Sequence, residues 1–163
     1  MRLGIIILLV ATLASCNQSY PEKPNIIFIL ADDLGYGDVL CYNSDSKIIT
    51  SNIDNLATQG VMFTDAHTSS SVCTPTRYGI LTGRYNWRST LKQGVLNGYS
   101  KALIPQERET IASYLKNSGY KTACIGKWHL GWDWANIENG FEHIDYSKKI
   151  NNGPIALGFD YFY

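Results

Sequence analysis

The chain has 163 residues, and its 14 acidic and 14 basic side chains give a formal net charge of zero at pH 7. This length is enough for one domain with a hydrophobic core, because domains usually contain roughly 100 to 200 residues. The neutral balance argues against nucleic acid as a partner, since proteins that bind it normally present a basic face.

Residues 1–16 have the pattern of an export signal. Arg2 supplies a positive flank, and the apolar stretch from Leu3 to Leu13 is far shorter than the ~20 residues that a membrane-spanning helix needs. The stretch ends in Leu13-Ala14-Ser15-Cys16, which resembles the lipobox of bacterial lipoproteins. In such signals the cysteine is lipidated and becomes the mature N-terminus.

We therefore expect an exported bacterial lipoprotein, periplasmic or at the cell surface, that a lipid on Cys16 anchors to the membrane. The alternative is a plain signal cleaved near Ala14, with an incidental Cys16. Residues 17–24 are polar and contain two prolines, so they predict a tether between the anchor and the folded domain.

Three further cysteines follow, Cys41, Cys73 and Cys124. An odd number cannot pair completely, so an exported protein with this set keeps at least one reactive or modified thiol. The spacing does not say which of the three it is.

The first predicted strand is the apolar run Ile26 to Leu30, which leads directly into Asp32 and Asp33. Ligands of parallel α/β sheets bind beyond the carboxyl ends of the strands. Two adjacent carboxylates repel each other unless a cation or hydrogen bonds neutralise them, and such oxygen ligands suit Ca²⁺ or Mg²⁺. The alternative is a turn that uses aspartate and glycine for backbone reasons.

The middle of the chain predicts a helix at residues 51–57 that ends at Gly60, then a strand at 61–63. A second helix is expected after Cys73, with Thr74 as its N-cap and Pro75 at its first position.

The electropositive start of this second helix would lie beside Cys73 and Arg77, with Arg77 in the first turn. A cation at that end of a helix suggests that a cysteine and an arginine converge on an anion. The alternative is a half-buried structural cysteine before an ordinary helix.

A loop at residues 85–98, a helix at 105–118 and a strand at 120–125 are expected next, followed by Lys127 and His129. If that segment stays extended, both side chains face the same side, where they would suit an anion. The alternative places the lysine in solvent and bonds the histidine into its loop.

The alternation of strands and helices predicts an α/β fold with a layered, mainly parallel sheet. The turn at Asn151–Pro154 and the aromatic run Gly158–Tyr163 suggest that the fold continues, so we expect the chain to be truncated.

These segments resemble the signatures of one family, the type I sulfatases. Cys73-Thr74-Pro75-Thr76-Arg77 followed by Leu81-Thr82-Gly83-Arg84 is similar to the first signature, and Gly119 to His129 is similar to the second. Pro24 to Gly35 resembles the first metal-binding strand. The resemblance implies an alkaline-phosphatase-like fold with helices on both faces of the sheet, of which residues 25–163 would be the N-terminal part.

The resemblance also implies a formylglycine-dependent hydrolysis of sulfate esters. A maturation enzyme would convert Cys73 to formylglycine, and a hydroxyl of the hydrated aldehyde would attack the sulfur. Asp32 and Asp33, with residue 73, would hold Ca²⁺, or Mg²⁺ as in some members.

The remaining family roles fall on three residues. Arg77 would stabilise the charged hydrate, Lys127 would bind a sulfate oxygen, and His129 would orient or deprotonate the formylglycine hydroxyl.

The chain also departs from the family pattern. A second metal-ligand pair and a further histidine and lysine come from later in the family's sequences, and nothing after His143 matches them, so we expect this chain alone to be inactive. Two alternatives stay open: a formylglycine-dependent phosphonate or phosphate ester hydrolase, and an inactive truncated fragment. Sulfated glycans or aryl sulfates are the expected substrates, and residues 85–99, with Trp87 and Arg88, could line a sugar subsite.

Overall fold

The computed structural model describes residues 23–163. The predicted export signal, with Cys16, and most of the predicted tether lie outside the described residues. The chain divides into two units, Met1–Leu34, of which residues 23–34 are described, and Gly35–Tyr163. No helix in residues 23–163 combines the length and the apolar character needed to cross a membrane.

In the first unit, the apolar run at residues 26–30 is extended, but it pairs with no strand in the described part of the chain. The prediction of a strand buried on both faces is therefore wrong for these residues. Ile27 and Ile29 are each 84% exposed. A strand of this kind needs neighbours that bond its backbone and cover both of its faces, and the described residues supply none. The run ends in a turn at Asp32 and Asp33.

The second unit begins with the short 3-10 helix η1 (Tyr36–Asp38) and the helix α2 (Ser51–Gln59), which ends at Gly60. The predicted helix is thus confirmed. The Thr50 hydroxyl bonds the Asp54 carboxylate and accepts the Leu40 N–H, which ties the start of α2 to the preceding loop. The predicted strand at residues 61–63 is wrong, because this segment is irregular and Val61 is 79% exposed.

Helix α3 (Cys73–Thr82) is confirmed with a different start. Its N-cap is the extended residue Val72, so Thr74 is the second helical residue and not the cap. Pro75 is the third residue, where its missing N–H costs nothing because the first four N–H groups of a helix lack helical partners. Gly83 ends the helix in the left-handed conformation, with φ 63°, and donates its N–H to the Gly79 carbonyl.

Helix α4 (Ile111–Asn117) is shorter than predicted. The Thr110 hydroxyl accepts the Ser113 N–H at 3.1 Å and caps the helix, while Pro105 begins a separate turn that the Arg108 N–H closes. The same threonine hydroxyl donates to the Leu157 carbonyl at 2.6 Å, so the cap also ties α4 to the C-terminal part of the unit.

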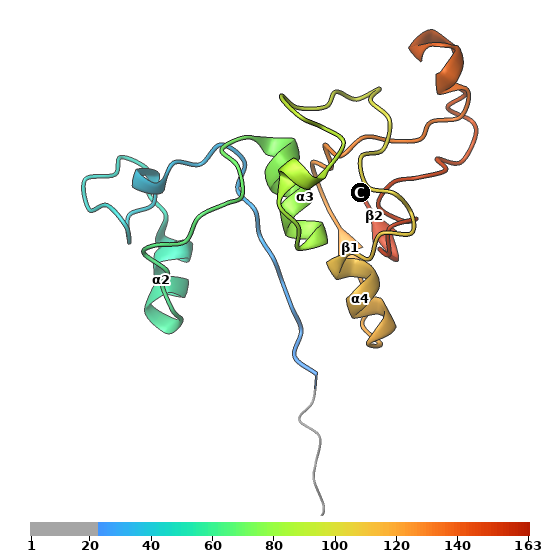
Figure 1. Ribbon diagram of the computed structural model, residues 1–163. Coiled ribbons are helices and arrows are strands. Elements are labelled where there is room, and N and C mark those ends of the chain that lie inside the picture. Colours follow the sequence, from blue (N-terminus) through green and yellow to red (C-terminus); the bar gives the residue numbers. More distant parts are fainter. Residues whose placement is uncertain (1–22) are drawn as a thin grey trace, which may run out of the picture. The chain divides into compact units, whose positions relative to one another are not determined.

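Two short strands, β1 (Ala123–Cys124) and β2 (Tyr161–Phe162), pair in parallel and lie side by side (Figure 1). A parallel pair is confirmed, whereas the layered sheet with helices on both faces is not present within the described residues. The Asp160 carboxylate accepts the Thr122 N–H at 2.9 Å and the Lys116 ammonium at 2.8 Å, which fixes β2 against both β1 and α4.

The hydrophobic core of this unit combines a residue of α3 with residues from the loop before α4 and from the segment between β1 and β2. Its buried members are Tyr78, Leu103, Ile104, Trp128, Leu130 and Leu157. Phe159 and Phe162 each meet the Trp128 ring edge-on at 6.5 Å between centroids. The aromatic run near the C-terminus therefore packs on Trp128, the residue between Lys127 and His129. Three further 3-10 helices, η2 (Asn86–Arg88), η3 (Ile137–Asn139) and η4 (Phe141–His143), lie in the loops.

Candidate active site

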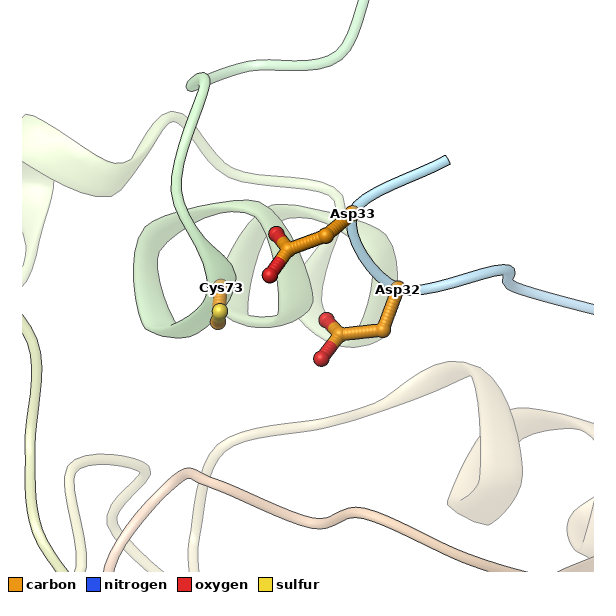
Figure 2. Close-up of side chains that lie close together, drawn as sticks. All are labelled: Asp32, Asp33 and Cys73. Atoms are coloured by element: carbon orange, nitrogen blue, oxygen red, sulfur yellow. The ribbon is translucent and has the colours of Figure 1, made fainter. Parts of the chain in front are cut away.

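Cys73 is the first residue of α3 and is half-buried (Figure 2). The Lys127 ammonium, which comes from the loop after β1, donates to the Cys73 sulfur at 3.3 Å. The structure thus brings together two residues that the sequence separates by a helix and a strand, and it places a cation directly on the predicted nucleophile position.

Arg77 approaches the same loop from α3. Its guanidinium donates to the Lys127 carbonyl. Because the helix starts at Cys73, Arg77 is the fifth helical residue and lies beyond the first turn where the sequence placed it. Arg77 and Cys73 thus both contact Lys127, and Arg77 positions the Lys127 backbone as well as adding positive charge. Their convergence on an anion stays a prediction.

The segment Gly126–His129 is not extended, so the condition under which Lys127 and His129 were expected to face the same side is not met. Gly126 has φ 95° and His129 has φ 55°, a left-handed conformation that a residue other than glycine rarely adopts. The ring nitrogen Nε2 of His129 lies 2.6 Å from the Leu96 carbonyl oxygen, whereas Nδ1 is buried and has no hydrogen-bond partner among the described residues. Lys127 therefore contacts the start of α3 through its ammonium, at Cys73, whereas His129 contacts it through its backbone carbonyl, at Thr74.

Thr74 and Leu96 belong to this site. The sequence predicted Thr74 only as a helix cap and predicted no role for Leu96. Thr74 is fully buried, and its hydroxyl donates to the His129 carbonyl at 2.9 Å and accepts the Leu96 N–H at 3.2 Å. These tertiary partners explain why Thr74 does not cap α3. No local pattern distinguishes such a threonine from a cap, so only the fold could identify it.

Asp32 and Asp33 belong to the first unit and follow each other on one turn (Figure 2). Their carboxylate oxygens come within 4.8 Å of each other, and Asp33 takes a left-handed φ of 58°. Two exposed carboxylates this close repel each other, and oxygen donors at such a separation fit a hard divalent cation. The chemistry of this donor pair is therefore that of a Ca²⁺ or Mg²⁺ ligand set.

The loop after α3 contains an exposed aromatic pair near its start and contacts the site near its end. Tyr85 and Trp87 stack on each other with ring centroids 4.1 Å apart, and both are more than half exposed. They follow the C-terminal end of α3, a helix about 15 Å long at about 1.5 Å rise per residue. Leu96, by contrast, returns to Thr74. The sugar subsite at residues 85–99, with Trp87 and Arg88, stays a prediction.

Cys41, Cys73 and Cys124 all carry free thiols. Burial raises the pKa of the Cys124 thiol, an effect that the nearby Arg77 charge opposes. Partial burial and the neighbouring Asp54 carboxylate raise the pKa of Cys41. Neither environment favours a reactive thiolate, and neither thiol has the direct lysine contact that Cys73 has.

The second unit thus defines an α/β protein in which a lysine contacts the cysteine that starts a helix, and an arginine of that helix bonds the lysine carbonyl. The family model described as Sulfatase matches residues 24–163, and the chain belongs to this family.

Curated relatives and solved structures agree with this membership. The chain is 42% identical over 159 residues to an N-acetylgalactosamine-6-O-sulfatase of Bacteroides thetaiotaomicron, covering 93% of this chain and 30% of the relative. It is 47% identical over 110 residues to human arylsulfatase A, covering 68% of this chain and 22% of that relative. The chain therefore spans less than a third of the length of these relatives.

A solved structure from work on the metabolism of multiple glycosaminoglycans by Bacteroides thetaiotaomicron matches with a TM-score of 0.75 and 44% identity. The match covers 86% of this chain and 28% of the other. The structure of Ps i-CgsB in complex with k-i-k-neocarrahexaose matches with a TM-score of 0.69 and 34% identity, over 86% and 28% of the two chains. The chain thus has part of the sulfatase fold, which is alkaline-phosphatase-like.

Proposed function

We propose that the protein is a sulfuric ester hydrolase that acts through formylglycine made from Cys73 and through a divalent cation. The observation that carries this proposal is the contact of 3.3 Å between the Lys127 ammonium and the Cys73 sulfur. The Lys127 ammonium lies beside the nucleophile position. It would therefore contact a tetrahedral oxyanion that binds at this position.

The sulfate group would be bound by positive charge from two elements. Lys127 would contact a sulfate oxygen, and Arg77, which bonds the Lys127 carbonyl, would support the loop and stabilise negative charge at residue 73. Both cations would act on charge that grows as the ester bond breaks, and one such donor typically contributes roughly 10²- to 10³-fold in rate.

Proton transfer would fall to His129. Its Nδ1 is buried without a partner among residues 23–163, so it can accept a proton from a hydroxyl on the modified residue 73. The hydrated aldehyde supplies a nucleophilic hydroxyl and a second hydroxyl whose deprotonation allows sulfate to leave.

Asp32 and Asp33 would hold Ca²⁺, with Mg²⁺ as the second choice. Their paired carboxylates match the oxygen ligands that both ions prefer. The ion would supply positive charge that neutralises sulfate oxygens and polarises the nucleophile.

We also infer where the protein acts and what it meets. The lipobox-like end of the predicted signal would place the protein outside the cytoplasm, anchored through Cys16, and a formylglycine-generating enzyme would be its maturation partner. Sulfated glycans or aryl sulfates would be its substrates, a choice supported by the relatives named as an N-acetylgalactosamine-6-O-sulfatase and an arylsulfatase.

The test compares two cysteine variants of the full-length protein, produced in a host that makes formylglycine. Cys73→Ala should abolish hydrolysis of aryl sulfate, whereas Cys41→Ala, which removes another half-buried free thiol, should leave it intact. The mass of the peptide that contains residue 73 should show conversion of the cysteine to the aldehyde. Activity in Cys73→Ala would refute the mechanism.

The same preparation should be offered aryl sulfate and aryl phosphate side by side, followed by a panel of 6-O-sulfated amino sugars. A preference for the phosphate would assign the protein to the phosphate ester hydrolases, because the same cations can bind either tetrahedral anion.

A further inference from the structure

Three hydrogen bonds link Thr74, Leu96 and His129 in a closed circuit. The Thr74 hydroxyl donates to the His129 carbonyl at 2.9 Å, and the Leu96 N–H donates back to the same hydroxyl at 3.2 Å. The Leu96 carbonyl oxygen then lies 2.6 Å from Nε2 of His129. The circuit joins α3, the loop that contains Leu96 and the loop after β1. The Thr74 side chain at its centre is fully buried.

The chemistry of the partners fixes where each proton is. A carbonyl oxygen only accepts, so the hydroxyl proton of Thr74 points to the His129 carbonyl oxygen. The lone pairs of the hydroxyl oxygen then accept the Leu96 N–H. For the same reason Nε2 must carry the proton in its contact with the Leu96 carbonyl. In the neutral ring Nδ1 is then unprotonated and acts as an acceptor.

We infer that Thr74 and Leu96 are positioning residues that hold His129 as its Nε2–H tautomer, so that Nδ1 is the proton-accepting atom of the site. The use of this acceptor rests on the proposed function, in which Nδ1 takes the proton of a hydroxyl on the modified residue 73. Thr74 follows residue 73 directly. One helical turn therefore carries both the modified residue 73 and the hydroxyl that positions its proposed base, His129.

Two further observations support a functional role for this geometry of His129. Nδ1 is buried and has no partner among the described residues, and a buried acceptor destabilises a fold unless a donor reaches it. His129 also has a left-handed backbone, with φ 55°, which surrounding contacts must hold in place. The bond from Thr74 to the His129 carbonyl is one such contact.

The first experiment observes the tautomer directly, by NMR of the full-length protein labelled with ¹⁵N-histidine, at a pH where the ring is neutral. The His129 signal is assigned by its loss in His129→Gln. We expect the proton on Nε2 in the wild type and in Thr74→Ser, and a mixture of tautomers in Thr74→Val. An Nδ1–H ring in the wild type would overturn the inference, whether or not any variant folds.

The second experiment measures aryl sulfate hydrolysis. Thr74→Val should lower kcat about tenfold with little change in KM, and Thr74→Ser should restore it, since only the hydroxyl is needed. The matched control is Thr82→Val at the other end of α3, whose hydroxyl also donates to a carbonyl and accepts an N–H. It should keep the wild-type kcat.

The two experiments separate the inference from the proposed function. If the protein hydrolyses no sulfate ester, the proposed function fails, and the tautomer measurement still decides whether the clamp exists. If Thr74→Val hydrolyses the ester at the wild-type rate, or keeps a single Nε2–H tautomer, the positioning role is refuted while the sulfatase activity stands.

Discussion

Leu130 is the residue next to His129, and it anchors the loop after β1 in the core. It is only 1% exposed and belongs to the buried cluster with Trp128 and Tyr78. Leu130→Ala removes three carbon atoms, worth about 2.4 kcal/mol at about 0.8 kcal/mol per buried CH₂. The cavity left behind adds to this, so we expect the free energy of unfolding to fall by about 3 to 4 kcal/mol.

Urea unfolding followed by tryptophan fluorescence measures this loss, because Trp128 packs in the same cluster. The matched control is Leu56→Ala on α2, where the leucine is 67% exposed and the change should stay within about 0.5 kcal/mol. A loss in Leu130→Ala no larger than in the control would refute the assignment of Leu130 to the core.

Three further predictions follow from the loops and the site. Gly131 has φ 77°, and a Cβ there would collide with the Lys101 carbonyl, so Gly131→Ala should lower the melting temperature far more than Gly94→Ala, whose Cβ would meet nothing within 4 Å; equal shifts would contradict this. The Lys116 ammonium, followed by the Thr122 N–H, lowers the pKa of Asp160 to about 2. The carboxylate therefore stabilises the fold above the unfolded pKa of about 3.9, and this stability is lost as the pH falls through about 2. Asp160→Asn should remove that acid-sensitive part of the stability, and an unchanged profile in thermal unfolding at pH 2 to 5 would speak against it. In the full-length protein, Lys127→Met should lower kcat/KM for aryl sulfate by roughly 10²- to 10³-fold; a loss below tenfold would exclude Lys127 as a sulfate ligand.

The sequence was sufficient for features that local chemistry determines. Helix α2 ends at the predicted glycine, Gly60, and α3 follows from the tolerance of Pro75 for an early helical position. The meeting of Cys73, Arg77 and Lys127 was also predicted, because an anion site needs cations and the motifs supply them at loop junctions.

What the sequence could not predict depends on partners far along the chain. The run at residues 26–30 has the composition of a buried strand, but composition does not provide the neighbouring strands that would pair with it. The Thr74 hydroxyl had a plausible local partner and takes two tertiary ones. In the same way, the aromatic residues 161–162 carry no local signal that they form the strand that pairs with β1.

The pairing of β2 with β1 has a consequence for the order in which the protein is built. The Gly126 N–H, directly before Lys127, donates to the Tyr163 carbonyl, and the Asp160 N–H donates to the Thr122 carbonyl. During synthesis at about 5 to 20 residues per second, Lys127 leaves the ribosome seconds before these partners. The nascent chain therefore carries Cys73 for a time before the bonds from residues 160–163 hold the segment of Lys127 in place.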